Sequence, residues 1–262
     1  PVLRHAEQRR RLLVVLGASP FLTGILCRKA AYFEDLFQAD EFSLAKQKER
    51  MLRELRRLIP DEADFPELQK GLRNFKSREI LRIGSRDLCG LASLEEVTGE
   101  LTDLAAATLQ RAYEICSRLM RLEHGAPLVE TEAGECCGEA EFTVLGMGKF
   151  GGRELNFSSD IDVIYFYTSD RGHTAGVPDA TGVPTNSIPL HKYFVRLAEM
   201  LTRAIGQVTD DGFVFRVDLR LRPEGNSGEM ANSLLGAEIY YESWGQSWER
   251  SAMLKALSLI HI

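Results

Sequence analysis

Two carboxylates separated by one residue stand at the start of an apolar run. Asp160 and Asp162 flank Ile161, and residues 161–168 are rich in Val, Ile, Tyr and Phe, which predicts a strand. Because residues i and i+2 of a strand point to the same face, we expect the two carboxylates to converge. Such a pair repels unless a cation lies between its members, and hard oxygen ligands suit Mg²⁺ or Mn²⁺. The alternative is a pair of solvated aspartates at the start of a strand.

A third carboxylate lies in a later segment with clear strand alternation. Residues 212–222 alternate between apolar and charged side chains, which predicts a strand. Asp218 would lie on the charged face, and beside the first pair it would complete a two-metal site. Arginines on the same face could hold phosphate oxygens by bidentate hydrogen bonds, or the face could simply be solvated and salt-bridged. The charged face comprises Arg216, Asp218, Arg220 and Arg222, and the apolar face Phe213, Phe215, Val217, Leu219 and Leu221.

A glycine-rich turn precedes both features. Residues 146–152 read Gly-Met-Gly-Lys-Phe-Gly-Gly and follow a predicted strand over residues 142–147. Glycines let backbone N–H groups approach a phosphate closely, whereas Lys149 could either contact a substrate or lie at the surface. Alone the turn is a weak signal. Together with the paired aspartates and the distant Asp218 it predicts a nucleotidyl-transfer site, in which one metal ion activates the attacking oxygen and another stabilises the leaving oxygen.

The first part of the chain, residues 1–124, is predicted to be a helical N-terminal region. Apolar periodicity predicts helices over residues 42–58 and, as a basic amphipathic stretch, over residues 68–82. The clearest helix begins at a capping box, Ser93 to Glu96, and ends at Gly125.

The second part of the chain predicts strands and helices around the candidate site. Residues 125–139 are rich in Gly, Glu and Thr and predict a linker, and residues 140–256 are expected to form the catalytic domain. Within it, residues 169–187 predict a long loop and residues 189–206 an amphipathic helix. The whole pattern predicts an α+β fold.

One uncharged segment resembles a membrane signal. Residues 12–27 follow three arginines, but Gly17, Ser19, Pro20 and Gly24 interrupt them, and the segment is shorter than a span of about 20 apolar residues. We therefore expect two short buried helices, separated at Ala18-Ser19-Pro20, and no membrane association.

Composition is that of a folded globular protein. The 262 residues are 44% apolar and 27% charged, which excludes a disordered chain, a collagen and a coiled-coil rod. Residues 1–82 hold 17 Lys/Arg against 12 Asp/Glu, and residues 83–262 hold 15 against 26, so an acidic second part argues against a nucleic-acid partner. Five cysteines without a CxxC pair predict reduced thiols and a cytoplasmic location.

The residues around these carboxylates resemble those of the glutamine synthetase adenylyltransferases (glutamate–ammonia-ligase adenylyltransferases). The resemblance covers about residues 10–256 and implies a helical region followed by a DNA-polymerase-beta-like nucleotidyltransferase domain. Residues 257–262 do not resemble the family, and we set them aside as a truncated or non-native tail. The matching segments are Gly17–Leu22, Phe75–Ile83, Arg86–Leu88, Gly146–Asp162, Asp211–Pro223, Trp248–Arg250 and Ala252–Ala256.

The resemblance also implies a reaction. Family members carry two catalytic domains: the first removes AMP from a tyrosine of glutamine synthetase by phosphorolysis and releases ADP, and the second attaches AMP from ATP. The wording of residues 156–162 resembles the adenylyl-removing copy. A metal-held phosphate would then attack the tyrosyl-AMP phosphorus, with the PII signalling protein as a regulatory partner. The implied metal ligands are Asp160, Asp162 and Asp218, and the implied phosphate- or nucleotide-binding residues are Gly151, Gly152, Ser159, Lys149, Arg220 and Arg222.

Three other interpretations stay open. The same site could attach AMP to glutamine synthetase from ATP, because metal ligands do not encode direction. The chain could instead be a non-catalytic module that binds nucleotide or a signalling partner, although three intact carboxylates argue against it. A nucleic-acid polymerase or tRNA end-adding enzyme would share the fold, but the acidic second part disfavours it.

Overall fold

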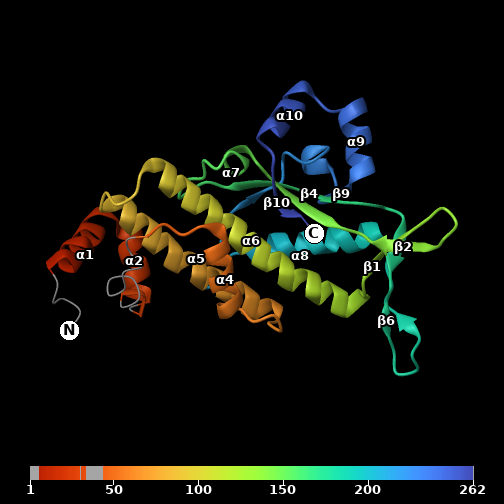
Figure 1. The fold of residues 1–262 in the computed structure, drawn as a ribbon, viewed down its shortest axis with the longest axis horizontal. Coiled ribbons are helices and arrows are strands. Elements are labelled where there is room, and N and C mark those ends of the chain that lie inside the picture. Colours follow the sequence, from red (N-terminus) through yellow and green to blue (C-terminus); the bar gives the residue numbers. More distant parts are fainter. Residues whose placement is uncertain (1–5, 30, 34–43, 262) are drawn as a thin grey trace.

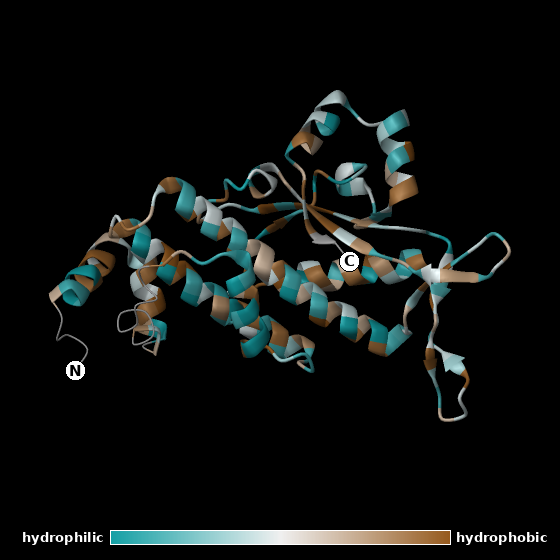
Figure 2. Cartoon of the chain, viewed as in Figure 1, coloured by the Kyte–Doolittle hydropathy of each residue, from teal (hydrophilic) through white to brown (hydrophobic). Residues whose placement is uncertain are grey.

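The computed structural model describes residues 6–29, 31–33 and 44–261, and in them helices and sheet combine as the predicted α+β class requires. Figure 1 shows long helices along the length of the molecule, with the main sheet lying over α6 and α8. In Figure 2 the central strands are largely apolar, whereas the helices carry bands of both kinds. The helices are therefore amphipathic and turn their apolar bands toward a shared core.

The first two helices lie at the predicted break. Helix α1 (Ala6–Ala18) and helix α2 (Pro20–Arg28) meet at Ser19, whose hydroxyl accepts a hydrogen bond from the Leu22 N–H at 3.2 Å. The two-helix prediction is confirmed, although Leu13 and Phe21 are more than half exposed rather than buried. No single described helix is long and apolar enough to span a membrane. Only α1 and α2 taken together reach that length and composition, and they are bent by 115°.

Three further helices complete the N-terminal part. Helix α4 (Lys48–Leu58) begins later than predicted; residues 42 and 43 lie outside the described residues. Helix α5 (Phe65–Leu88) is longer than the predicted 68–82, because an Asp64–Glu67 capping box starts it. Helix α6 (Leu94–His124) has the predicted capping box at Ser93 and ends at Gly125, whose φ of 80° suits glycine.

Helix α5 buries three of its arginines, Arg73, Arg82 and Arg86. The guanidinium of Arg73 donates to the backbone carbonyls of Gln69, Ala204 and Gly212. A buried ion network then ties the same helix to α6 and to the segment before α4, with each charge facing an opposite one. Its most buried members are Lys46, Glu79, Arg82, Arg86 and Glu100.

The main sheet has the strand order β10-β3-β4-β8. Strand β3 (Phe142–Met147) pairs antiparallel with β4 (Ile161–Tyr167), and β4 pairs in parallel with β8 (Val217–Asp218) and β9 (Ala231–Ser233). Strand β10 (Leu257–His261) pairs antiparallel with β3, and Leu259 is buried. Setting residues 257–261 aside was therefore wrong: they complete an edge of the sheet.

The strand predicted over residues 212–222 is only two residues long. Val214 is buried although the alternation assigns it to neither face, and the backbone N–H groups of Val214 and Phe215 donate to the Ile205 carbonyl at the end of helix α8 (Leu190–Gly206). Packing against this helix end takes the place of strand pairing. The period-two pattern was thus misleading outside β8.

The predicted linker is a hairpin. Strand β1 (Pro127–Glu130) pairs antiparallel with β2 (Cys136–Glu139), and β1 also pairs with β5 (Gly172–Thr174). The predicted loop 169–187 likewise contains β5 and a small ribbon, β6 (Val177–Pro178) with β7 (Pro184–Thr185). Backbone pairing between two polar segments far apart in sequence is invisible to local periodicity.

One core joins the helical part to the sheet. The ring of Phe142 on β3 stacks on Tyr113 of α6 at 5.6 Å and on Phe194 of α8 at 5.8 Å between centroids. Residues from the predicted regions 1–124 and 140–256 belong to the same buried cluster. Beyond the sheet lie α9 (Leu234–Ser243) and α10 (Ser247–Ala252), on the side away from α8 in Figure 1.

Candidate active site

The parallel pairing of β4 with β8 brings two of the predicted carboxylates together. Asp162 and Asp218 are register partners on these adjacent strands, directly after the Ile161–Val217 pair. Asp160 lies two residues before Asp162 and enters the same neighbourhood from the loop that leads into β4. The three aspartates thus gather at one end of the sheet, although 56 or more residues separate Asp218 from the other two.

Arginines hold the two outer carboxylates. The Arg216 guanidinium donates to Asp160 and, at 2.7 Å, to the carbonyl of Ser158. The Arg220 Nε donates to both oxygens of Asp218 at 3.0 and 2.8 Å, and its backbone N–H adds a third bond. These hydrogen bonds from Arg220 lower the pKa of the Asp218 carboxyl. Asp218 is therefore stabilised as an anion.

The middle carboxylate carries uncompensated negative charge. Burial, followed by repulsion from Asp218 and Asp160, raises the pKa of Asp162, while Arg220 and Lys149 only partly oppose this. A cation between the carboxylates would relieve the repulsion that raises the pKa of Asp162. The electrostatics of the cluster therefore favour a positively charged ligand.

The glycine turn places its backbone beside this carboxylate. Helix α7 (Gly148–Gly151) connects β3 to the loop, and Gly148 has a φ of +53°. A Cβ there would lie 2.6 Å from Asp162 Oδ2, so only glycine lets the turn and the carboxylate meet. Gly151 has a packing reason instead, since its Cβ would lie 1.9 Å from the Lys255 carbonyl oxygen.

The structure gives other predicted phosphate-binding residues local partners. The Gly152 N–H donates to the Gly148 carbonyl at 3.0 Å, and the Ser159 hydroxyl donates to Asn156 Oδ1 at 2.7 Å. Lys149 is exposed. Arg222 is buried and donates to the carbonyl of Leu219 before it and to those of Asn226 and Gly228 after it. Arg222 therefore holds the loop after β8 together and does not point into the site as a free cation.

The donor set fits a hard divalent cation, but the carboxylates are engaged by arginine. Within residues 6–29, 31–33 and 44–261, no three His, Cys, Asp or Glu side chains are arranged to hold a metal ion. Arg216 and Arg220 supply positive charge at Asp160 and Asp218 in this arrangement. Carboxylate oxygens remain the ligands that Mg²⁺ and Mn²⁺ prefer.

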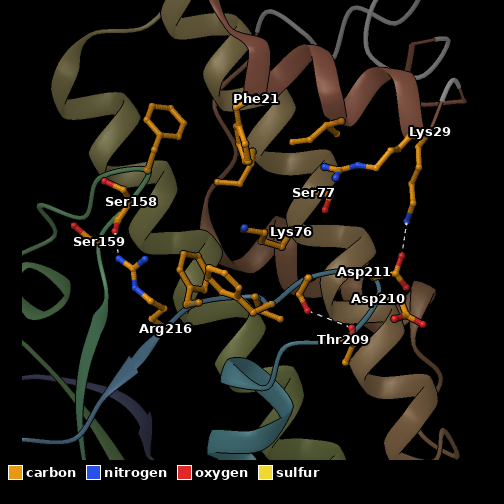
Figure 3. A pocket seen from close by; sticks show the side chains of 18 residues that line it. Phe21, Lys29, Lys76, Ser77, Ser158, Ser159, Thr209, Asp210, Asp211 and Arg216 are labelled. Carbon is orange, nitrogen blue, oxygen red and sulfur yellow. Dashed lines mark hydrogen bonds and ion pairs between the residues drawn. The ribbon is translucent and has the colours of Figure 1, made fainter.

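A pocket beside this cluster was missed by the sequence analysis. It has a volume of about 580 Å³ and lies between helices α2 and α5 on one side and the loop before β4 and residues 209–216 on the other. Figure 3 shows Lys76 of α5 pointing into it across from Ser158, Ser159 and Arg216. Periodicity marked Lys76 only as part of a basic helix, so no sequence signal joined it to the aspartates.

A mixed sheet that gathers three carboxylates beside a glycine turn defines a protein with a candidate site for metal-assisted group transfer. The sequence profile of the glutamate-ammonia ligase adenylyltransferase family matches residues 9–261. The chain therefore belongs to that family. The match includes strand β10, which lies beyond the resemblance over residues 10–256.

Curated relatives agree along nearly the whole chain. Proteins from Nitrosococcus oceani and Shewanella oneidensis are each 38% identical, over 96% and 97% of this chain and 25% of their own length. A protein from Pseudomonas aeruginosa is 38% identical over 92% of this chain and 23% of its own. All three bear the name bifunctional glutamine synthetase adenylyltransferase/adenylyl-removing enzyme. The chain thus spans about a quarter of the length of these relatives.

Proposed function

We propose that this chain is a nucleotidyltransferase domain that removes AMP from the adenylylated tyrosine of glutamine synthetase by phosphorolysis. The observation that carries the proposal is the pairing of Asp162 with Asp218 on adjacent parallel strands, with Asp160 beside them. Family membership and the names of the relatives support glutamine synthetase as the protein substrate. The sequence of residues 156–162 supports the removing direction, because it resembles the adenylyl-removing copy. The sheet is proposed to be of the DNA-polymerase-beta-like kind.

The proposed cofactor is Mg²⁺ or Mn²⁺, held by Asp160, Asp162 and Asp218. When bound, such an ion supplies charge neutralisation and activation of the attacking oxygen. The raised pKa of Asp162 supports this, because the repulsion from its two neighbours is what a cation offsets. Arg216 and Arg220 would then leave Asp160 and Asp218 and turn to phosphate oxygens, for which their guanidinium groups are suited.

The reaction balances as a single substitution at phosphorus. An oxygen of orthophosphate forms a bond to the phosphorus of the tyrosyl-AMP group, and the bond from that phosphorus to the tyrosine oxygen breaks. The tyrosine oxygen takes up a proton, and the products are ADP and unmodified glutamine synthetase. ADP and orthophosphate are therefore the proposed small-molecule partners, with ATP in the opposite reaction and PII as the proposed regulator.

The opposite reaction is the second candidate. The names of the relatives include both adenylyltransferase and adenylyl-removing activities, and the chain covers only about a quarter of each relative. The same three carboxylates would serve the attachment of AMP from ATP, in which the tyrosine oxygen forms a bond to the α-phosphorus and pyrophosphate leaves, because both reactions are metal-assisted substitutions at phosphorus. Direction is therefore to be measured rather than inferred from the ligands.

The test uses the 262-residue chain. It is mixed with AMP-modified glutamine synthetase, Mg²⁺ and orthophosphate, and ADP release is followed in the wild type and in an Asp160→Asn/Asp162→Asn variant. The matched control is Glu199→Gln, an exposed carboxylate on α8 away from the site. We expect phosphate-dependent ADP from the wild type and the control, and a loss of at least a hundredfold in the double variant.

Other outcomes discriminate between the two candidates. AMP transfer from ATP to unmodified glutamine synthetase, without phosphorolysis, would replace the removing reaction by the attaching one. Equal activity of the wild type and the double variant would refute the assigned carboxylates. No activity in either direction, from a chain shown to be folded, would favour a non-catalytic module.

A further inference from the structure

The pocket beside the aspartates has a charge opposite to that of the chain. Four cationic and two acidic side chains line it, whereas the whole chain has a formal net charge of −6. The cations are Arg28, Lys29, Lys76 and Arg216, and the acids are Asp210 and Asp211. A concave site with local positive charge attracts anions and raises their local concentration.

The charges within the pocket are segregated. At one end Lys29 approaches Asp211 at 3.8 Å, so these two charges largely compensate each other. At the other end Lys76 faces Ser158, Ser159 and Arg216, as Figure 3 shows. An anion would therefore be repelled from the Asp210–Asp211 end and attracted to the end that lies next to Asp160.

Lys76 is a lining cation without a counter-charge among the described residues. Its ammonium lies 5.4 Å from the centre of the Phe213 ring, and no carboxylate or hydrogen-bond acceptor pairs with it among the described residues. Burial lowers the pKa of Lys76, which is the signature of a cation that loses water without gaining an anion. An anion that pairs with such a desolvated ammonium group offsets the free-energy cost of its burial.

Arg216 connects this end of the pocket to the catalytic cluster. Its guanidinium donates to Asp160 and to the Ser158 carbonyl, while its side chain lines the pocket. The pocket and the aspartate cluster therefore share a wall, formed by Ser158, Ser159 and Arg216. The hydroxyls of Ser77 and Ser158 add hydrogen-bond donors to the pocket.

We propose that the Lys76 end of this pocket is a binding site for a phosphate group, held by Lys76 together with Arg216 and the serine hydroxyls. The phosphate is either free orthophosphate or the phosphate of a nucleotide, whose base could then stack on the exposed rings of Phe21 and Phe157. The assignment to orthophosphate as attacking co-substrate rests on the proposed function. The phosphate chemistry itself rests only on the pocket.

The first experiment titrates inorganic phosphate into the 262-residue chain in a calorimeter, at constant ionic strength. We expect saturable binding that Lys76→Gln weakens at least tenfold and Lys76→Arg largely retains. The matched control, Lys70→Gln, removes an exposed lysine from the same helix outside the pocket and is expected to bind as the wild type does. Unchanged binding by a folded Lys76→Gln variant, or no saturable binding by the wild type, would overturn the proposal.

A second arm identifies the source of the phosphate. AMP and ADP are titrated with and without orthophosphate: mutual displacement, with Lys76→Gln weakening both, assigns the site to a nucleotide phosphate. Simultaneous binding of AMP and orthophosphate, with only orthophosphate weakened by the substitution, assigns it to the free anion. Nucleotide binding that Lys76→Gln leaves unchanged, together with unaltered phosphate affinity, contradicts both.

A chemical readout avoids substitution altogether. Acetylation of lysines with a water-soluble reagent, followed by mass spectrometry, should show Lys76 protected at least threefold by phosphate while Lys70 reacts at a constant rate. Equal reactivity of Lys76 with and without phosphate would count against the site.

Failure of this proposal can be told apart from failure of the proposed function. Asp162→Asn is expected to abolish ADP formation and to leave phosphate binding in place. Phosphate binding that depends on Lys76, without any ADP formation by the wild type, would keep the pocket and refute the reaction. ADP formation by Lys76→Gln with a wild-type KM for phosphate, together with unchanged binding of orthophosphate and AMP, would keep the reaction and refute the pocket.

Discussion

The buried ion network under α5 gives a strong quantitative prediction. Glu100 is 4% exposed and accepts hydrogen bonds from the Lys46 N–H and from the guanidinium groups of Arg82 and Arg86. Glu100→Gln keeps the shape but removes the charge. Arg82 retains Glu79 as a partner, whereas Arg86 keeps two long contacts of 3.5 Å, to the half-exposed Glu96 and to the Leu91 carbonyl.

The expected cost follows from these contacts. Two charge-assisted hydrogen bonds to buried guanidinium groups are each worth about 1.5–3 kcal/mol. A buried pair that loses one charged partner costs about 3–5 kcal/mol, because the remaining charge stays desolvated. We therefore expect Glu100→Gln to lower the free energy of unfolding by about 3–5 kcal/mol, which is at least two decades in the unfolding equilibrium.

Urea unfolding followed by circular dichroism measures this loss, with Glu199→Gln as a control that should change stability by less than about 0.5 kcal/mol. A loss under about 1 kcal/mol in Glu100→Gln would refute the reasoning, because it would mean that Arg86 and Arg82 are compensated by other groups or by solvent. Because α5 also carries Lys76, the network is expected to support the position of the phosphate pocket.

Three further predictions follow from single residues. Burial raises the pKa of Glu79, but the charges of Arg82 and Lys46 outweigh it and lower that pKa below its usual value. The ionised Glu79 therefore stabilises the fold fully above the unfolded pKa of about 4.3, and this contribution is lost as the pH falls through the folded pKa. The difference in unfolding free energy between the wild type and Glu79→Gln should close below about pH 4 in urea titrations, and a constant difference would contradict this. Gly151→Ala should destabilise by about 1–3 kcal/mol or more in thermal melts, since its Cβ meets the Lys255 carbonyl, whereas Gly17→Ala, with nothing within 4 Å, should be neutral or stabilising. Burial raises the pKa of Cys116 to about 12, so iodoacetamide at pH 8 should alkylate the exposed Cys27, Cys136 and Cys137 and spare Cys116; rapid labelling of Cys116 in the folded chain would show that its surroundings open.

Elements governed by local chemistry were predictable from the sequence. The capping box at Ser93 and the glycine at residue 125 set both ends of α6, and Ser19 with Pro20 separates α1 from α2. Hydrogen bonds within three or four residues decide these boundaries, so no distant partner needs to be known.

Elements governed by distant contacts were not. Residues 125–139 lack the composition of a strand, and residues 257–261 do not match the family segments, yet each finds a pairing partner elsewhere in the chain. The alternation in residues 212–222 is strong, yet the end of α8 takes up part of its backbone and limits the strand to two residues. In each case the tertiary partner determines the local structure.

By itself the sequence determined which side chains are the candidates for the chemistry. Asp160 and Asp162 belong together through their i, i+2 spacing, and the glycine-rich residues 146–152 predict a turn before them. Only the tertiary structure decided which distant residues lie beside them. Asp218 lies beside Asp162 because β4 and β8 pair in parallel. Lys76 lies across the adjoining pocket because α5 forms one wall of it. The reason is physical, since spacing fixes the direction of neighbouring side chains, whereas the convergence of distant ones depends on how buried surfaces pack.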